Sequence, residues 1–336
     1  MSAIHGGAAQ KNDDVRHRIW QAAKSRENTV ERTRNMVWVL LALGGAICTS
    51  LTTILAKIGI KDVNSNFATA YRTGIVIVCS LVMCAITGDI AKVANLTAYN
   101  WLFLVLSGLA TGVSWLFYFG ALKEGDVNKV APIDKSSFVL TTILFLIFFF
   151  DDTTKGGDPL TIGMLCLTMV LMLVGTFLMI PKLDKTEIEQ PKSKRWLIFA
   201  ILSAVFASLV SLFVKLGLKG IPSDVGTFYR TLVVFVFAMA IVLAKKDYKG
   251  AKEITAKSWI FLTLSGIATG GAWLLEYAAL NFDGANPVAV NCIGKLSILL
   301  TMLLSWLVMK EKFTARSLIG LALLTAGIGL IIGFSL

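Results

Sequence analysis

Charged residues are scarce in this sequence. Only 16% of its 336 residues are charged, whereas 56% are apolar and the mean hydropathy is +0.73. A soluble domain carries about 25% charged residues. The apolar residues also come in long blocks separated by short polar breaks. These proportions exclude an ordinary soluble domain and leave no room for a separate catalytic domain.

The motifs of most enzymes are missing as well. The chain has two histidines, His5 and His17, and both precede the first apolar block. There is no HExxH, no GxSxG and no P-loop sequence, so zinc-protease, serine-hydrolase and ATP-driven functions have no support. The five cysteines lie inside apolar blocks without CxxC spacing, which predicts neither a disulfide framework nor a zinc site. We therefore expect no enzyme, no metal and no cofactor.

The sequence does contain ten apolar blocks, each long enough to cross a bilayer as a helix. About 20 residues are needed, because lipid offers backbone groups no hydrogen-bond partner and a helix satisfies its own. The predicted spans are Met36–Ala56, Phe67–Thr87, Tyr99–Leu122, Val127–Phe150, Leu160–Ile180, Arg195–Lys215, Val225–Ala244, Lys257–Leu280, Asn286–Met309 and Ala315–Leu336. We predict an all-α, multi-pass protein of the cell membrane, with the lipid bilayer and a small molecule as partners and no nucleic acid.

Residues 1–35 form a hydrophilic tail with seven basic and four acidic residues. The tail lacks the apolar region of a cleavable signal peptide, so we expect the first span to act as an uncleaved signal anchor. The basic residues of the tail favour a cytoplasmic position, but those of the loops favour the opposite orientation. The even number of spans predicts only that both termini lie on the same side.

The most informative feature is an internal repeat. Shifting the chain by 158 residues aligns Trp38–Ala131 with Trp196–Ala289 without a gap, with 34 identities over 94 pairs. The sequence YRT recurs at Tyr71–Thr73 and Tyr229–Thr231, and a two-residue shift later pairs Lys135 with Lys295. Such self-similarity indicates a duplicated unit.

Each repeat holds five spans, an odd number, so the second copy must enter the membrane from the opposite side. We therefore predict two inverted five-helix repeats, residues 36–181 and 195–336, joined by a linker loop at 182–194. Inverted repeats are typical of secondary transporters, which bind substrate near the bilayer midplane where the repeats meet and expose it alternately to each side. The GxxxG patterns Gly108–Gly112, Gly266–Gly270 and Gly329–Gly333 predict close helix packing.

Three runs of the first repeat carry a resemblance to a known family: AKIGIKDVNSNFATAYRT (Ala56–Thr73), LSGLATGVSWLFYFGAL (Leu106–Leu122) and GDVNKVAPIDKSS (Gly125–Ser137). They resemble the EamA-type repeat of the drug/metabolite transporter superfamily, and both halves of the chain are covered. The resemblance implies a transporter and gives almost no information about its substrate. In the second half VAVNCIGKLS (Val288–Ser297) replaces VAPIDKSS, so the proline and aspartate are absent there and the lysine is kept.

Ionisable residues near the middle of a span are costly, by at least about 2.5 kcal/mol each, and so need a partner or a purpose. Asp134 and Lys135 lie about eight residues into the fourth predicted span, and Lys295 lies at a similar depth in the ninth. Asp134 and Lys135 are candidates for proton coupling, and Lys295 is a candidate for substrate binding. Alternatively, Asp134 is only the counter-ion of Lys135, Lys295 or Arg230 and holds the bundle together.

The repeated YRT motif supplies further candidates for substrate binding. Arg72 and Arg230, with the neighbouring Tyr71 and Tyr229, fall near the start of the second and seventh spans. A guanidinium group suits recognition of carboxylate or phosphate. The alternative for each arginine is that its long side chain reaches the lipid headgroups or caps a helix end.

Aromatic and acidic residues complete the candidate set. Glu276 takes the place of Tyr118 in the second repeat and lies one turn from Trp273. The residue at the equivalent position of the other repeat is called the mate, and the mate of Trp273 is Trp115. Such groups around a cavity could bind a cation, whereas aromatic residues packed near the membrane interface are the commoner outcome. The deep positions hold more positive than negative groups, which favours an anionic or zwitterionic metabolite. We therefore predict a secondary transporter with Trp115, Trp273 and Glu276 at its site; the alternatives are an exporter of cationic drugs, a membrane-embedded enzyme and a scaffold.

Overall fold

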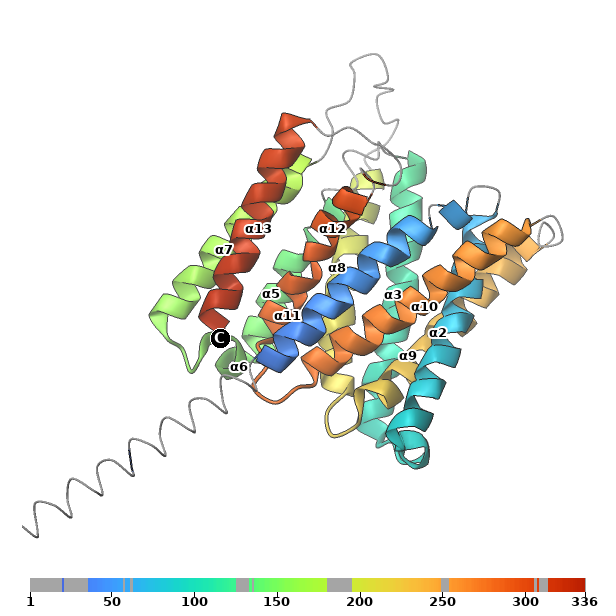
Figure 1. Ribbon diagram of the computed structural model, residues 1–336, viewed down its shortest axis with the longest axis horizontal. Helices are drawn as coiled ribbons and strands as arrows, with labels where there is room; N and C mark the ends of the chain where they lie inside the picture. Colours follow the sequence, from blue (N-terminus) through green and yellow to red (C-terminus); the bar gives the residue numbers. More distant parts are fainter. Residues whose placement is uncertain are drawn as a thin grey trace, which may run out of the picture.

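The structure, a computed structural model, describes residues 20, 36–56, 58–60, 63–124, 133–134, 136–179, 195–248, 254–304, 307 and 314–335. Within these ranges the chain is helical and has no strand (Figure 1). The first helix is Met36–Ala56. The others are α2 (Ser65–Thr87), η1 (Asp89–Ala94), α3 (Ala98–Glu124), α5 (Ser137–Phe148), α6 (Phe150–Thr154), α7 (Pro159–Met179), α8 (Arg195–Gly217), α9 (Ser223–Lys245), α10 (Ala256–Leu280), α11 (Pro287–Gly294), α12 (Leu296–Leu304) and α13 (Ala315–Ser335). The 1–35 tail and the 182–194 linker lie outside the described residues, apart from Trp20.

Nine segments of the described chain are long and apolar enough to cross a membrane, each at the place of a predicted span. The fourth predicted span, Val127–Phe150, is represented by α5, which is apolar but has only 12 residues. Residues 125–132, which would lengthen it, are outside the description. The protein is therefore an all-helical, multi-pass membrane protein, and a tenth complete span stays a prediction.

The ninth span is interrupted at its middle. The helix α11 ends at Gly294, and α12 begins at Leu296, so the break falls at Lys295. In the first repeat Lys135 is equivalent to Lys295, and α5 begins two residues after it, at Ser137. Interrupted helices in transporters place backbone groups and ionisable side chains beside a cavity at membrane depth.

Helix starts follow local capping. The side chain of Asn64 accepts hydrogen bonds at the start of α2, and Asn286 does the same for α11. Asp158 precedes Pro159 and accepts hydrogen bonds from the hydroxyl and the amide of Thr161. These bonds hold the pKa of the Asp158 carboxyl below its usual value, because they stabilise the charged form.

The helices α2 and α9 occupy equivalent positions in the two repeats and pack antiparallel against each other. At one end, Asn66 near the start of α2 donates to Asp247, just after α9, at 2.7 Å. At the other end, Thr87 of α2 donates to Asp224 of α9 at 2.7 Å. Because the start of each helix is bonded to the end of the other, the two helices run in opposite directions.

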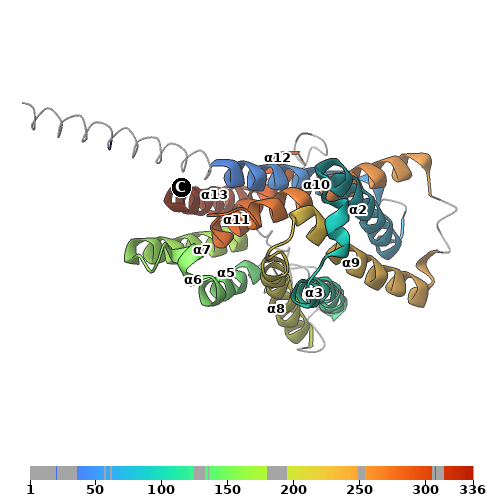
Figure 2. The ribbon, with the colours of Figure 1, turned by 90° about the horizontal axis from the view of Figure 1, so that it is seen from below.

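A second pair, α7 and α13, lies at the edge of the molecule (Figures 1 and 2). It also runs antiparallel, because Ser317 near the start of α13 donates to the carbonyl of Met179 at the end of α7, at 3.4 Å. Gly175 of α7 and Gly320 of α13 bring the two backbones into close contact. A Cβ added to Gly175 would lie 2.6 Å from the carbonyl oxygen of Gly320, and a Cβ added to Gly320 would lie 2.5 Å from the carbonyl oxygen of Gly175. The last equivalent helices of the two repeats therefore also run in opposite directions.

Contacts between the repeats are reciprocal. The Ser107 hydroxyl of α3 bonds the Val210 carbonyl of α8 at 3.4 Å, and its mate Ser265 of α10 bonds the Thr52 carbonyl of the first helix at 2.9 Å. The first two GxxxG patterns mediate the same kind of contact: an added Cβ at Gly108 or at Gly266 would lie 2.7 Å from a side chain of the opposite repeat. In contrast, no described atom lies within 4 Å of a Cβ added at Gly329 or Gly333, so that predicted contact is absent among the described residues.

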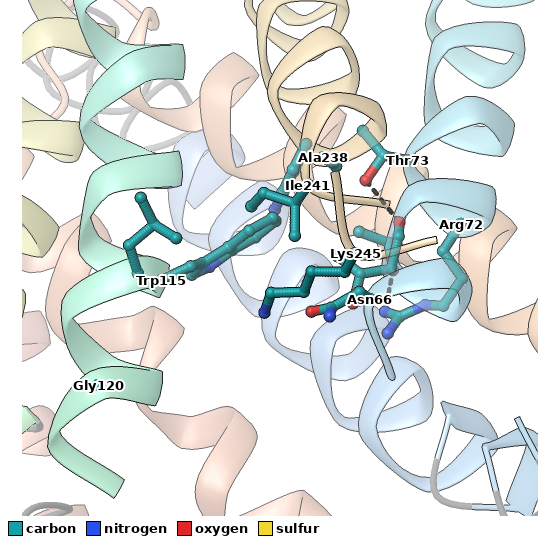
Figure 3. Close-up of a pocket in the computed structure, with 12 residues that line it drawn as sticks. Asn66, Arg72, Thr73, Trp115, Gly120, Ala238, Ile241 and Lys245 are labelled. Atoms are coloured by element: carbon teal, nitrogen blue, oxygen red, sulfur yellow. Dashed lines mark hydrogen bonds between the residues drawn. The ribbon is translucent and has the colours of Figure 1, made fainter. Parts of the chain in front are cut away.

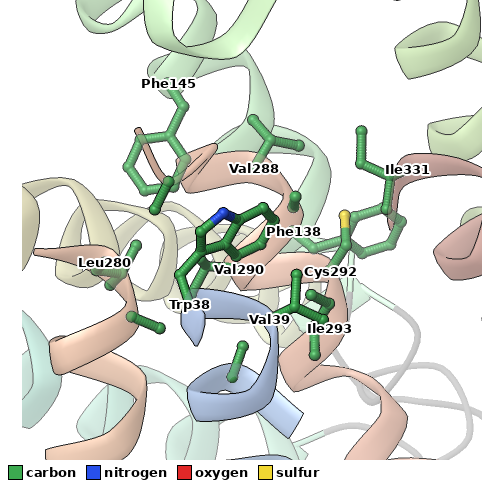
Figure 4. Close-up of a cluster of buried hydrophobic side chains, with 14 of the residues drawn as sticks. Trp38, Val39, Phe138, Phe145, Leu280, Val288, Val290, Cys292, Ile293 and Ile331 are labelled. Atoms are coloured by element: carbon green, nitrogen blue, oxygen red, sulfur yellow. The ribbon is translucent and has the colours of Figure 1, made fainter. Parts of the chain in front are cut away.

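The largest apolar cluster is built by the first helix together with residues of α5, α7, α8, α10, α11 and α13, and Trp273 packs against it. Trp38 of the first helix is fully buried in this cluster (Figure 4). The cluster joins the two repeats into one body. The helices α2, α3, α9 and α10 lie on the opposite side of the bundle from α7 and α13 (Figure 1).

Candidate functional site

A cavity of about 510 Å³ opens between α2, α3, α9 and α10 (Figure 3). Its polar lining residues are Asn66, Thr69, Arg72, Thr73, Lys245 and Thr269. Its apolar lining residues are Trp115, Leu116, Gly120, Ala238, Ile241 and Trp273. Both repeats contribute to it, as predicted for a site where the repeats meet. Arg72, Trp115 and Trp273 are the predicted site residues that line it.

Arg72 comes from the first half of α2 and is partly exposed to the cavity. Its Nη2 donates to Thr269 Oγ1 of α10 at 2.9 Å. Its Nε is buried and has no hydrogen-bond partner in the described part of the chain. The Thr269 hydroxyl in turn donates to the Ser265 carbonyl at 2.7 Å, which fixes its lone pairs toward the guanidinium group. Arg72 is thus oriented by the opposite repeat and keeps unused donor capacity.

Lys245, the last residue of α9, adds a second positive charge to the cavity. Its side chain is exposed and extends between Trp115 and Asn66 (Figure 3). The Asn66 amide is itself held by Asp247, to which it donates at 2.7 Å. No acidic side chain is among the described residues that line the cavity.

The two indoles of the cavity are mates in the repeat, Trp115 from α3 and Trp273 from α10. The ring of Trp273 also contacts Arg230, whose Cζ lies 4.6 Å from the ring centroid. Arg230 further contacts Tyr277, with 5.5 Å between Cζ and the ring centroid. A cation–π contact of this kind stabilises a buried guanidinium. Trp273 therefore lies between Arg230 and the cavity.

Arg230 repeats the contact of its mate Arg72 in a closed environment. Its Nη2 donates to Thr111 Oγ1 at 2.9 Å, as Arg72 does to Thr269, and its Nε donates to Ser107 at 2.9 Å. Arg230 is only 3% exposed, so it does not reach the lipid headgroups. Its Nη1 is buried without a hydrogen-bond partner among the described residues.

Three further α2 residues of the cavity have buried mates in α9. Thr227 and Thr231, the mates of Thr69 and Thr73, have no exposed surface. Asp224, the mate of Asn66, is 5% exposed and accepts the hydrogen bond from Thr87, the mate of Lys245. The α2 positions Asn66, Thr69, Arg72 and Thr73 border the cavity, whereas their mates in α9 are buried; Thr87, the mate of Lys245, is exposed.

Glu276 and Lys295 are not among the residues that line the cavity. The positive charges of Lys295 and Arg230 both act on the Glu276 carboxyl. Lys295 occupies the break between α11 and α12. The charges of these three predicted residues therefore influence one another, although only Arg230 is buried and Glu276 and Lys295 are half-buried.

Asp134 lies in a different environment. It accepts a hydrogen bond from Ser203 of α8 at 2.9 Å and lies close enough to Tyr118 for its charge to act on the phenol. The Ser203 hydroxyl also bonds the carbonyl of Ser114 at 3.2 Å. Lys135, the second predicted coupling residue, lies outside the described residues.

The tyrosines of the YRT motifs do not line the cavity. Tyr71 packs on Trp259 with 4.7 Å between ring centroids, and its hydroxyl shares a hydrogen bond with Thr263 at 2.9 Å. Its mate Tyr229 packs on Trp101 at 4.5 Å. The geometry places both tyrosines as packing residues that hold the start of α2 and α9 against the neighbouring helices.

The sequence interpretation missed five polar lining residues, namely Asn66, Thr69, Thr73, Lys245 and Thr269. Lys245 lies one residue beyond Ala244, the predicted end of the seventh span. Thr69 lies three residues before Arg72 and Thr73 lies four residues after Thr69, so helical periodicity around YRT is the signal that could find them. Among the described residues, no group of three His, Cys, Asp or Glu side chains could hold a metal.

Comparison with known proteins gives the family. The sequence matches the EamA-like transporter family twice, over residues 36–174 and 194–333. It is 45% identical over 111 residues to a Sinorhizobium protein described as an uncharacterized transporter in the cobO 3' region, covering 33% of this chain and 79% of that protein. One solved crystal structure superimposes with a TM-score of 0.69 at 16% identity, over 88% of this chain and 98% of that one, which is a likeness of fold. Two family matches that together span most of the chain, one on each repeat, show that this protein belongs to the EamA-like transporter family.

Proposed function

We propose that the chain is a secondary active transporter that carries a small metabolite across the cell membrane by alternating access. This proposal rests on a difference between two equivalent sets of residues, those of α2 around Arg72 and those of α9 around Arg230. The Arg72 half borders an open cavity, whereas the Arg230 half is buried. A duplicated protein with similar halves can exchange their states at a small cost in free energy, because many contacts of one state have equivalents in the other.

The proposed movement exchanges the environments of the two halves. In the second state Arg230 would border a cavity, and Arg72 would be enclosed against Thr269 and Trp115. The hydrogen bond from Thr87 to Asp224 would break in that state, since it closes the end of α2 and α9 nearest Arg230. Residues 36–181 and 195–336 would act as the two inverted five-helix repeats.

We further propose that proton movement drives the transport and that Asp134 is the coupling group, with Lys135 beside it. The carboxyl of Asp134 accepts a hydroxyl hydrogen bond from Ser203 of the other repeat, so its protonation would alter a contact between the repeats. Glu276 then serves as the counter-ion of Arg230 and Lys295.

The experiment that tests transport uses purified protein in liposomes. Amino acids, organic anions, phosphorylated sugars and cationic drugs are first screened for ligands that raise the melting temperature. Each stabilising ligand is then assayed for uptake across an imposed pH gradient. Protein-dependent uptake that Arg72→Gln abolishes, and that Lys246→Gln at an exposed site beside the cavity leaves intact, supports the proposal. Ligands that bind and are never moved by the native protein would refute it.

A further inference from the structure

The described lining of the cavity is positively charged. Arg72 and Lys245 border it, and no acidic side chain is among the described residues that do so. Thr69, Thr73, Thr269 and Asn66 add only neutral hydrogen-bonding groups. Such a lining stabilises an anion and disfavours a cation, because like charges repel strongly at a site partly shielded from water.

The guanidinium group of Arg72 is held in a fixed orientation and has donors left for a ligand. One guanidinium nitrogen is fixed by Thr269 at 2.9 Å, while the buried Nε has no partner among the described residues. A guanidinium group carries five N–H donors and the bond to Thr269 uses one of them, so an acceptor on a ligand in the cavity can bond others. The planar guanidinium presents its donors in the geometry that matches a carboxylate.

One face of the Trp273 indole is already occupied by a positive charge of the protein. An indole face attracts cations, but the Cζ of Arg230 lies 4.6 Å from the centroid of this ring, which leaves one face fewer for a cationic ligand. The free surfaces of Trp273 and Trp115 instead provide two flat apolar walls, which suit the offset or edge contacts of an aromatic body.

Building on the proposed transport function, we infer that the substrate is a small organic anion with a flat apolar body. Its carboxylate binds Arg72 and Lys245, and its ring packs against Trp115 and Trp273. The volume of about 510 Å³ suits such a molecule, since small-molecule sites measure about 300–1,000 Å³.

The test is equilibrium binding to the purified full-length protein, with probes that share one ring system and differ in charge. Indole-3-acetate carries the ring and the carboxylate, indole-3-acetamide is neutral, tryptamine is cationic, and acetate lacks the ring. We expect indole-3-acetate to bind most tightly. The amide and acetate should each bind at least about tenfold more weakly, the ratio for losing one charge-assisted hydrogen bond or one apolar contact. Tryptamine should not compete with it.

Matched variants assign the binding to this cavity. Lys245→Gln should weaken binding of indole-3-acetate, whereas Lys246→Gln removes an equal charge from the neighbouring exposed residue and should have little effect. Trp115→Leu should weaken binding of indole-3-acetate more than that of acetate, whereas Trp101→Leu, on the same helix but outside the cavity, should not. Arg72→Lys should retain part of the affinity that Arg72→Gln loses.

The outcomes separate this inference from the proposed function. Tight binding of tryptamine or of the amide, or binding of none of the probes, overturns the anion assignment, even if the protein transports another compound. Binding of indole-3-acetate that depends on Arg72 and Lys245 supports the assignment, even if liposomes show no uptake; that result would refute transport alone.

Discussion

Arg72 and Arg230 show how far packing, rather than residue type, decides the role of a side chain. Both follow a tyrosine, and both donate to an equivalent threonine at 2.9 Å. One borders a cavity, whereas the other is 3% exposed and is enclosed by Trp273 and Tyr277. The sequence predicts the pair from the repeated YRT motif, but it cannot predict which arginine is accessible, since that depends on the state of the whole bundle.

Lysine substitution should separate these two roles. Arg230→Lys loses the paired contacts to Ser107 and Thr111, because an ammonium group cannot reproduce the guanidinium fork. We expect it to lower the free energy of unfolding by about 1–3 kcal/mol. Arg72→Lys, in the open cavity, should change stability by less than about 1 kcal/mol and weaken binding of a carboxylated substrate instead. Denaturant titration and binding assays on both variants measure the difference, and equal binding by Arg72→Lys would leave Arg72 as an anchoring residue.

Asp134 allows a second test at a single position. In Asp134→Asn the side-chain oxygen can still accept the hydrogen bond from Ser203, but the group can no longer take up a proton. We expect uptake driven by a pH gradient to be abolished, while the melting temperature and the exchange of labelled for unlabelled substrate persist. Uptake by the folded variant that equals the native rate would remove Asp134 from the coupling mechanism.

At the scale of the element, the spans were predictable because long apolar blocks have few alternatives in lipid. Nine of the ten predicted spans have a described helix that could cross a membrane. The break at Lys295 was not predicted, because hydropathy averaged over a span does not report where a helix is interrupted. The missed lining residue Lys245 has a similar cause, since the end of a span is uncertain by a few residues from sequence.

The glycines of α3 and α10 are required by close packing, and the structure predicts the cost of replacing them. A Cβ at Gly112 would lie 2.3 Å from the ring of Phe237, so Gly112→Ala forces α3 and α9 apart. We expect a loss of about 1–3 kcal/mol in the free energy of unfolding, typical of overpacking. Unfolding in detergent, followed by circular dichroism, measures it.

Gly163→Ala in α7 is the matched control. Apart from the neighbouring backbone of α7 itself, no described atom lies within 4 Å of a Cβ placed there, so the substitution should be neutral or should stabilise the helix by up to about 1 kcal/mol. A Gly112→Ala protein as stable as the Gly163→Ala protein would show that α3 and α9 are packed less closely than the structure indicates.

At the scale of the whole molecule, the duplication gives several cavity residues a mate in a different environment. Thr69 lines the cavity, and its mate Thr227 has no exposed surface. The repeat itself was evident from sequence, because identities survive at a fixed offset. The location of the cavity was not, because it depends on how α2, α3, α9 and α10 are tilted against each other in one state.

These mates provide the test of alternating access. In a variant without the native cysteines, the thiol introduced by Thr69→Cys should react with a membrane-impermeant maleimide added on one side. The thiol introduced by Thr227→Cys should be protected. Thr87→Val removes the hydroxyl that bonds Asp224 at 2.7 Å, so it should favour the second state. We expect it to slow labelling at position 69 and to expose position 227 to maleimide added on the opposite side.

The direction of labelling decides between the possible arrangements. Two inverted repeats that exchange states must expose mates to opposite sides, because the rotation that superimposes one repeat on the other also interchanges the two faces of the membrane. Reaction of both thiols from the same side would contradict the inverted topology, even though α2 and α9 are antiparallel. If position 227 stays protected with substrate present, both with and without the Thr87→Val substitution, the residues around Arg230 form a fixed structural core. The cavity around Arg72 would then be a binding site that opens to one side only.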